Sequence, residues 1–230
     1  MLQLYHHPMS GPSRYIRLLL GEYGLSASFA EEKPWQRRRE FLALNPAGTL
    51  PVLIDGENTL VCGAVVAGEY LDETCGAMMR EKRLMPENPR ERAEVRRLTE
   101  WFLGKFEEEV ARYLVVERVF KTLMSGQEGG GAPEATLIRA GRANLKNHLR
   151  YVGWLAASRN WLAGPRLSHA DMAAAAALSV MDYLGEVGWD QEPAARDWYA
   201  RVKSRPSFRP LLADRLPSLP PVSHYVDLDF

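Results

Sequence analysis

The chain has 230 residues, of which 46% are hydrophobic, and its 29 basic residues balance its 29 acidic residues. This composition supports a full hydrophobic core, and the absence of excess positive charge argues against a general nucleic-acid binder. The sequence shows no basic leader and no apolar run long enough to span a bilayer, so we expect a cytoplasmic protein.

The two cysteines, Cys62 and Cys75, have no metal-like spacing with the five histidines. We therefore predict free, mostly buried thiols and no metal site. The alternative is that Cys62 acts as a redox nucleophile. The pattern favours a small buried side chain at this position over a nucleophile.

The first third of the chain alternates strands and helices. Residues 2–6 have the alternation of a strand, Pro12 opens a helix that Gly24 ends, residues 27–33 form a possible second strand, and residues 36–44 a short helix. His6 and His7 point to opposite faces of the first strand, which favours a packing or surface role over metal ligation.

Trp35 precedes the run Arg37-Arg38-Arg39 in the predicted short helix. Three adjacent arginines favour a solvated face of the helix, and the alternative is a binding patch. Tryptophan next to arginine is typical of an interaction hot spot, and a partly buried anchor for the helix is an equally good interpretation.

The stretch from Asn45 to Leu53 has turn residues that lead directly into a short apolar strand. Pro51 lies at the start of that strand and lacks the N–H that a neighbouring strand would bond, so we expect an edge, a bend or a cis peptide there. Residues 52–54 and 59–61 are spaced for an antiparallel hairpin, and a helix follows along 64–71. The order βαβ-ββα predicts a four-stranded sheet in about eighty residues.

After Pro86 and Pro89 the pattern becomes helical. Apolar residues recur every three or four positions from Leu98 to Tyr113 and again from Leu137 to Val152, with a flexible connection at residues 125–133. Ser168 and Asp171 form a capping box at the start of a central helix, and a further helix covers residues 193–204. We predict three segments: a sheet domain at 1–84, a helical domain at 90–213 and a Pro-rich tail at 214–230.

The tail ends in large apolar and acidic side chains. It can dock on its own domain, act as a short linear motif, or fray, and the sequence leaves these three possibilities open. The residues concerned are Tyr225, Asp227, Leu228, Asp229 and Phe230.

The motif Asn45-Pro46-Ala47-Gly48-Thr49-Leu50-Pro51-Val52-Leu53 and the capping box at Ser168 together resemble the glutathione transferases. The resemblance implies an α+β, thioredoxin-like N-terminal domain followed by an all-α C-terminal domain, usually in a homodimer. It also implies a cis proline at Pro51 and a backbone at Leu50 that pairs with glutathione.

Ser10 and the pair Cys62-Gly63 bear on whether this chain can bind and activate glutathione as the family does. Ser10 matches the residue that stabilises the glutathione thiolate, although a plain helix cap explains it as well. Cys62 and Gly63 stand where the family has an acidic residue or Gln followed by Ser. Gly63 is left with only a backbone N–H to offer an anion, and each lost bond to a charged group costs roughly 1.5–3 kcal/mol. We expect a vestigial glutathione site at Leu50, Pro51, Cys62 and Gly63, and no cofactor.

The tail makes the resemblance more specific. The chain resembles a branch of the family that acts in cell division in alphaproteobacteria and binds FtsZ filaments. That branch implies a non-enzymatic dimer at the midcell division ring, which favours filament curvature and constriction. The candidate contact residues are Trp35, Arg38, Glu117, Arg118, Tyr225, Asp227, Leu228, Asp229 and Phe230. The alternatives are an active glutathione transferase that uses Ser10, and a structural partner in a different complex that uses the tail as its ligand.

Overall fold

The computed structural model describes residues 1–56, 59–217 and 219–228. Its sheet consists of β1 (Leu2–His6), β2 (Ala27–Glu31), β3 (Val52–Asp55) and β4 (Thr59–Cys62), in the order β2-β1-β3-β4. β1 pairs parallel with β2 and antiparallel with β3, and β3 pairs antiparallel with β4. The predicted mixed sheet is confirmed.

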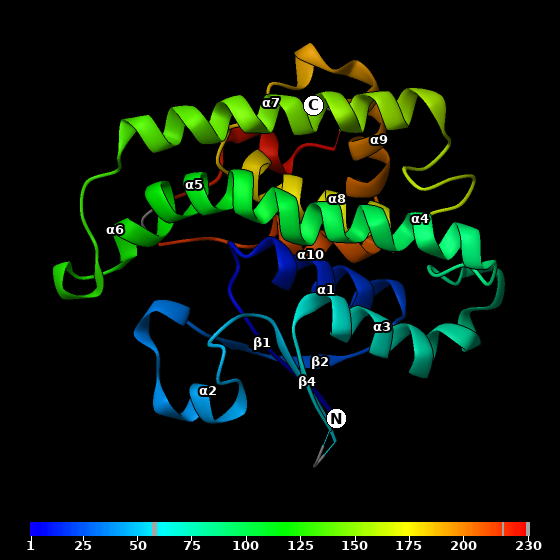
Figure 1. Ribbon diagram of the computed structural model, residues 1–230, viewed down its shortest axis with the longest axis horizontal. Coiled ribbons are helices and arrows are strands. Elements are labelled where there is room, and N and C mark those ends of the chain that lie inside the picture. Colours follow the sequence, from blue (N-terminus) through cyan, green and yellow to red (C-terminus); the bar gives the residue numbers. More distant parts are fainter. Residues whose placement is uncertain (57–58, 218, 229–230) are drawn as a thin grey trace.

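Side chains that alternate between the two faces of each strand explain why both faces of the sheet are packed against helices. Leu4, Leu53 and Val61 belong to the buried core, and helices α1 (Gly11–Glu22) and α3 (Ala64–Cys75) lie between the sheet and the helical layer (Figure 1). On the opposite face Tyr5 packs against Phe41 of α2 (Arg39–Leu44), with ring centroids 5.9 Å apart. Successive residues of a strand point to opposite faces, which is why both layers form.

The helical layer contains two long rods that lie side by side (Figure 1). The first runs from α4 (Pro89–Glu100) through α5 (Arg112–Val115) to α6 (Lys121–Leu123), with π-helical turns at Trp101–Lys105, Glu107–Ala111 and Val116–Phe120. The second is α7 (Ala135–Ser158). Both follow the predicted apolar spacing.

Helix α8 (His169–Tyr183) lies at the centre of this layer, and all its residues are buried. The run of alanines permits close approach of α1. The predicted capping box is present: the Asp171 carboxylate accepts from the Ser168 N–H at 3.0 Å, and its other oxygen accepts from the Leu162 N–H and the Trp198 indole, both at 2.9 Å. Helices α9 (Pro193–Lys203) and α10 (Arg209–Leu212) complete the layer.

The sheet and helical layers meet across a buried polar contact as well as across apolar side chains. The imidazole of His169 bonds to the hydroxyl groups of Tyr15 at 2.5 Å and Tyr23 at 2.9 Å. Burial lowers the pKa of His169 to about 4, so the imidazole is neutral near pH 7. The Tyr23 hydroxyl also donates to the Asp72 carboxylate. Asp72 in turn forms an ion pair with Arg83 at 2.6 Å.

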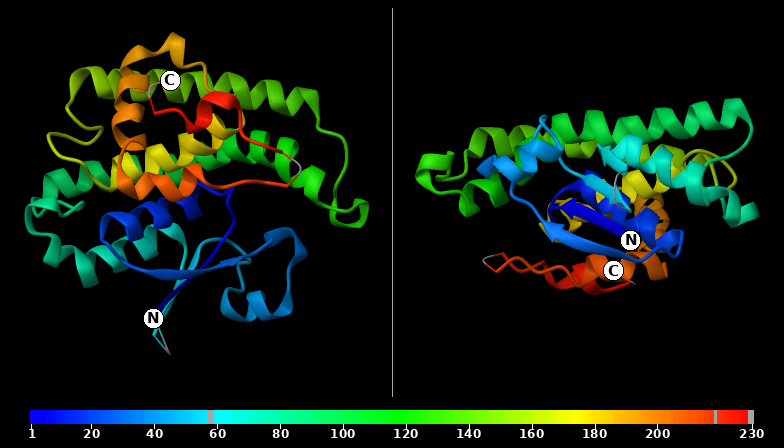
Figure 2. Two further views of the ribbon diagram at one scale, coloured as in Figure 1. Left: turned by 180° about the vertical axis from the view of Figure 1, so that it is seen from behind. Right: turned by 90° about the horizontal axis from the view of Figure 1, so that it is seen from below.

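The last segment lies across the back of the helical layer (Figure 2), where Val222 N–H donates to the carbonyl of Tyr183 at 3.2 Å. Tyr225, in the 3-10 turn Ser223–Val226, is fully buried, and the buried Arg14 donates to its hydroxyl at 3.0 Å. This part of the tail therefore docks on the folded chain, where it contacts both α8 and α1.

The predicted bounds of one helix and one strand differ from those in the structure, and two other predictions concern residues that the structure does not describe. The predicted helix at residues 36–44 begins only at Arg39, because Arg37 adopts a left-handed conformation with φ 46° after the turn Pro34–Gln36. The strand predicted to reach Lys33 ends at Glu31. The hairpin turn at 57–58 and the terminal Asp229 and Phe230 lie outside the described residues. In the part described, no helix has the length and apolar character needed to cross a membrane.

Candidate functional site

The loop before β3 has the predicted cis peptide between Leu50 and Pro51. Asn45 shapes the loop: its amide donates to the carbonyl of Thr49 at 2.8 Å and accepts from the Ala47 N–H at 3.2 Å. Within the described ranges, Leu50 shows no backbone hydrogen bond, so its polar groups remain available for an extended ligand.

The backbone of Gly63 is already engaged. Its N–H donates to the carbonyl of Pro51 at 3.0 Å, which ties the start of α3 to the cis-proline loop. The expectation that this N–H remains for an anion was therefore wrong, because a neighbouring strand end uses it.

Cys62 is a half-buried thiol whose sulfur lies 3.8 Å from the carbonyl of Leu44. Burial raises the pKa of this thiol, which disfavours the thiolate that nucleophilic or redox chemistry requires. The structure thus supports the packing interpretation of Cys62.

Ser10 is the N-cap of α1, and its hydroxyl oxygen accepts from the Ser13 N–H at 3.2 Å. The cap interpretation is confirmed. The hydroxyl hydrogen is not used in this bond, so Ser10 can still donate to a ligand at the helix N-terminus.

A carboxylate that the sequence analysis missed lies at the same helix end. Glu107 Oε1 is 2.6 Å from where a Cβ on Gly11 would be, so a side chain at the first position of α1 would force this carboxyl to move. Desolvation raises the pKa of Glu107 to about 8. A thiolate bound at this N-terminus would meet a like charge whenever Glu107 is ionised. The run Glu107-Glu108-Glu109 resembles a solvated face, so no local pattern distinguishes Glu107 from its exposed neighbour Glu108.

An aromatic cluster, formed by His7, Trp35 and Phe120, joins the end of β1 to the long rod. The Trp35 ring lies 4.9 Å from Phe120 and 5.6 Å from His7, measured between ring centroids. Burial lowers the pKa of His7 to about 4, so this side chain is neutral near pH 7. Trp35 is therefore a partly buried anchor, one of its two predicted interpretations, and both His6 and His7 are buried by packing.

Arg38 remains a surface residue, with 46% of its side chain exposed, but it also has a structural role. It pairs at 2.6 Å with Glu32, which is almost fully buried. Replacing Arg38 by a neutral residue would leave that carboxylate without its ion partner.

Glu117 and Arg118 are less accessible than predicted. Glu117 is buried, and it binds Lys121 at 2.7 Å and the backbone N–H of Glu134 at 2.8 Å, which ties the long rod to the start of α7. Arg118 pairs with Glu186 and donates to the carbonyl of Leu184 at 3.0 Å. Direct contact of Glu117 with a partner is therefore corrected to a structural role.

The candidate tail residues divide into two groups. Tyr225 is fully buried, so its predicted contact with a partner is also corrected to a structural role. Asp227 and Leu228 are exposed, whereas Asp229 and Phe230 lie outside the described residues.

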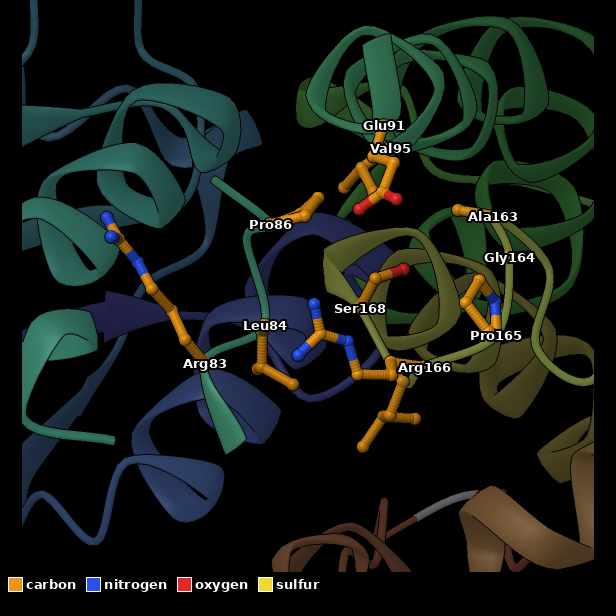
Figure 3. A pocket seen from close by; sticks show the side chains of 11 residues that line it. Arg83, Leu84, Pro86, Glu91, Val95, Ala163, Gly164, Pro165, Arg166 and Ser168 are labelled. Carbon is orange, nitrogen blue, oxygen red and sulfur yellow. The ribbon is translucent and has the colours of Figure 1, made fainter. Parts of the chain in front are cut away.

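A recess at the junction of the two layers shares no lining residue with the vestigial site. Its volume is about 30 Å³, room for a single water, between the linker at Leu84 and Pro86 and the loop at Pro165 and Arg166. In Figure 3 the Arg166 guanidinium points between these segments, whereas Arg83 points away toward α3. This recess cannot hold a tripeptide.

Both halves of the chain match known family models. Residues 4–78 match the glutathione S-transferase N-terminal domain, and residues 116–206 match the glutathione S-transferase C-terminal domain. These models together cover more than half of the chain.

Relatives of similar length give the same result. The chain is 44% identical over 230 residues to FtsZ-localized protein A of Caulobacter vibrioides, covering 99% of this chain and 97% of the relative. The crystal structure described as a glutathione S-transferase from Sinorhizobium meliloti is 58% identical, with a TM-score of 0.98 and full coverage of both chains. The structure of FzlA from C. crescentus has a TM-score of 0.92 at 44% identity, and covers 100% of this chain and 99% of that one. This chain belongs to the glutathione S-transferase family.

Proposed function

We propose that this protein is a non-enzymatic family member that acts in cell division at the division ring. It binds FtsZ filaments as a dimer, favours their curvature and promotes constriction. The observation that carries the proposal is the end-to-end identity of 44% to FtsZ-localized protein A. A dimer suits a repeating filament because two linked sites raise avidity without new contacts.

The vestigial site supports the absence of transferase activity. Cys62 and Gly63 offer no carboxylate, amide or hydroxyl for the charged end of glutathione, and the Gly63 N–H is bonded to Pro51. Each missing bond to a charged group costs roughly 1.5–3 kcal/mol, so affinity falls by about two orders of magnitude or more. Glu107 places a carboxyl at the end of α1 where a thiolate would lie, and this carboxyl becomes a like charge as the pH rises through about 8.

Two exposed segments are the proposed FtsZ contacts. The first is the surface around Trp35 and Arg38, where a partly exposed tryptophan is followed along the chain by exposed arginines. The second is the tail end at Asp227 and Leu228, where Leu228 is 43% exposed next to an exposed carboxylate. The tail end can also serve other division proteins, as in peptide motifs that add to a groove or sheet edge.

The second candidate function is an active glutathione transferase, favoured by the 58% identity to the Sinorhizobium meliloti protein described as one. In that case Ser10, which has a free hydroxyl hydrogen at a helix N-terminus, would stabilise the thiolate.

Co-sedimentation with FtsZ filaments, combined with calorimetry against glutathione, tests the two functions on the same preparation. We expect the protein in the FtsZ pellet and no glutathione heat at about millimolar concentration. Absence of the protein from the pellet, together with micromolar glutathione binding, would replace the proposal with the transferase.

Variants test the contact residues in the same assay. Asp227→Lys and Trp35→Ala should each lower the pelleted fraction several-fold, because each removes a charge or aromatic surface from a proposed contact. Glu108→Lys is the matched control for charge, since Glu108 is exposed and lies on the long rod. Unchanged pelleting of both test variants would exclude these two contact surfaces.

A further inference from the structure

Helix α7 has a row of exposed cations on one side: Arg139, Arg142, Lys146 and Arg150. Their spacing of three and four residues places them along one face of the helix. At a rise of about 1.5 Å per residue, the row is about 17 Å long. The chain as a whole has no net charge, so this is a local concentration of positive charge rather than a property of the composition.

The row borders a groove of about 300 Å³ between α7 and the loop that follows α8. Leu145, Leu149 and Val187 are the apolar residues of the lining, and they are only 2%, 4% and 8% exposed. Gly188 and Gln191 line the side formed by the loop. The α7 groove therefore combines a cationic edge with a small apolar floor.

The acids that face the α7 groove do not neutralise the row. Glu186 is shared by two arginines: Arg142 binds it at 2.6 Å, and Arg118 pairs with it from the long rod. Within the described residues, Lys146 and Arg150 form no ion pair. Glu192 is the remaining acid in the lining, and its carboxylate packs against Gly153 of α7.

We infer that the α7 groove binds an extended peptide of a protein partner in which acidic and apolar residues alternate. In an extended chain, successive side chains point to opposite sides, so acids can face Lys146 and Arg150 while apolar side chains enter the groove. The row matches about five residues of such a peptide at about 3.3 Å per residue. This site is separate from the surfaces proposed to bind FtsZ.

The shape and charge of the groove favour a peptide over other anionic partners. A flat membrane surface would meet the cations but leave the apolar lining unfilled. A nucleic-acid backbone would bring phosphates against Glu192 and has no apolar side chains for Leu145 and Leu149. A peptide of alternating character satisfies both the charged edge and the small apolar floor.

Fluorescence anisotropy with a labelled peptide of alternating glutamate and leucine tests the inference on the full chain. The double variant Lys146→Glu, Arg150→Glu should bind it at least about tenfold more weakly than the wild type at low salt. A double variant of two other exposed arginines, Arg90→Glu, Arg112→Glu, makes the same change in net charge and should bind as the wild type does. A peptide of glutamine and leucine should bind weakly to all three proteins.

Other outcomes overturn the inference. Equal binding of the acidic peptide to both double variants would show that general attraction, not the groove, holds it. No binding of the peptide to the wild type would also exclude the site. Capture of the wild type by anionic lipid vesicles, lost in the Lys146→Glu, Arg150→Glu variant while the peptide does not bind, would assign the cationic row to a membrane surface.

Discussion

Individual residues decide the chemistry that is left at the vestigial site. Cys62 and Gly63 have no carboxylate, amide or hydroxyl in their side chains, the Gly63 N–H is bonded within the fold, and Ser10 caps α1. Glu107 adds a poorly solvated carboxyl at the end of the helix where an anion would bind. The site is thus less suited to a thiolate than its motif implies.

Glu107 also makes stability depend on pH. Its pKa in the folded protein, about 8, lies above that of an unfolded glutamate, so the folded state binds the extra proton between the two values. Its contribution is fully present below about pH 4.5 and is lost as the pH rises through about 8.

We expect Glu107→Gln to remove this loss. Above about pH 8 the variant should exceed the wild type in free energy of unfolding, by on the order of 1 kcal/mol or more, with the difference shrinking toward about pH 5. Urea unfolding across this range measures it, with Glu108→Gln as the exposed control. A difference that does not vary with pH would contradict the assignment.

At the scale of elements, α8 organises the helical layer because its N-terminus is specified in detail. One oxygen of Asp171 closes the capping box with Ser168, while the other holds the backbone of Leu162 and the indole of Trp198. The capping box at Ser125 and Glu128 lies at the surface, where the Glu128 carboxylate accepts from Ser125 and from the side chain of Gln36. The same local motif therefore contributes more to stability at the buried start of α8 than at the surface turn.

The two caps predict different costs. Asp171→Ala leaves several buried donors unpaired and should lower the free energy of unfolding by about 3 kcal/mol or more. Glu128→Ala breaks a cap at the surface and should cost clearly less than Asp171→Ala, because water can satisfy the groups that it leaves. Chemical denaturation of both variants gives the comparison, and similar losses would show that burial of the Asp171 network adds nothing.

At the scale of the whole molecule, one surface is suited to pairing with a second copy. Val65 and Val66 of α3 are 40% and 58% exposed. A hollow of about 440 Å³ beside them is lined in part by Glu69 and Arg96, which pair at 2.7 Å. Exposed apolar side chains next to a charged rim are typical of a subunit interface.

Val66→Glu should therefore shift the proposed dimer to monomer, because a dimer would bury two carboxylates without partners. Light scattering coupled to size exclusion measures the mass over a range of concentrations. Val226→Glu places the same charge at an exposed valine of the tail and should leave the mass unchanged. A dimer that survives Val66→Glu would place the interface elsewhere.

Much of the architecture follows from local sequence patterns. Alternation in residues 2–6, the turn residues before Pro51, the apolar spacing of the long rods and the capping box at Ser168 all correspond to observed elements. These features arise from neighbours within a few residues, so they can be read without the fold. The break at Arg37 was missed, because a left-handed arginine has no strong local signature.

The sequence by itself determined the fold and the family, and it led to the prediction of a vestigial glutathione site at Cys62 and Gly63. Tertiary structure alone decided which residues are accessible: it buries Tyr225 and Glu117, places Glu107 against α1, and bonds the Gly63 N–H to Pro51. The physical reason is that secondary structure depends on short-range periodicity, whereas burial, desolvation and pairing depend on segments far apart in the chain. Only when these segments pack together do their charges and hydrogen bonds acquire partners.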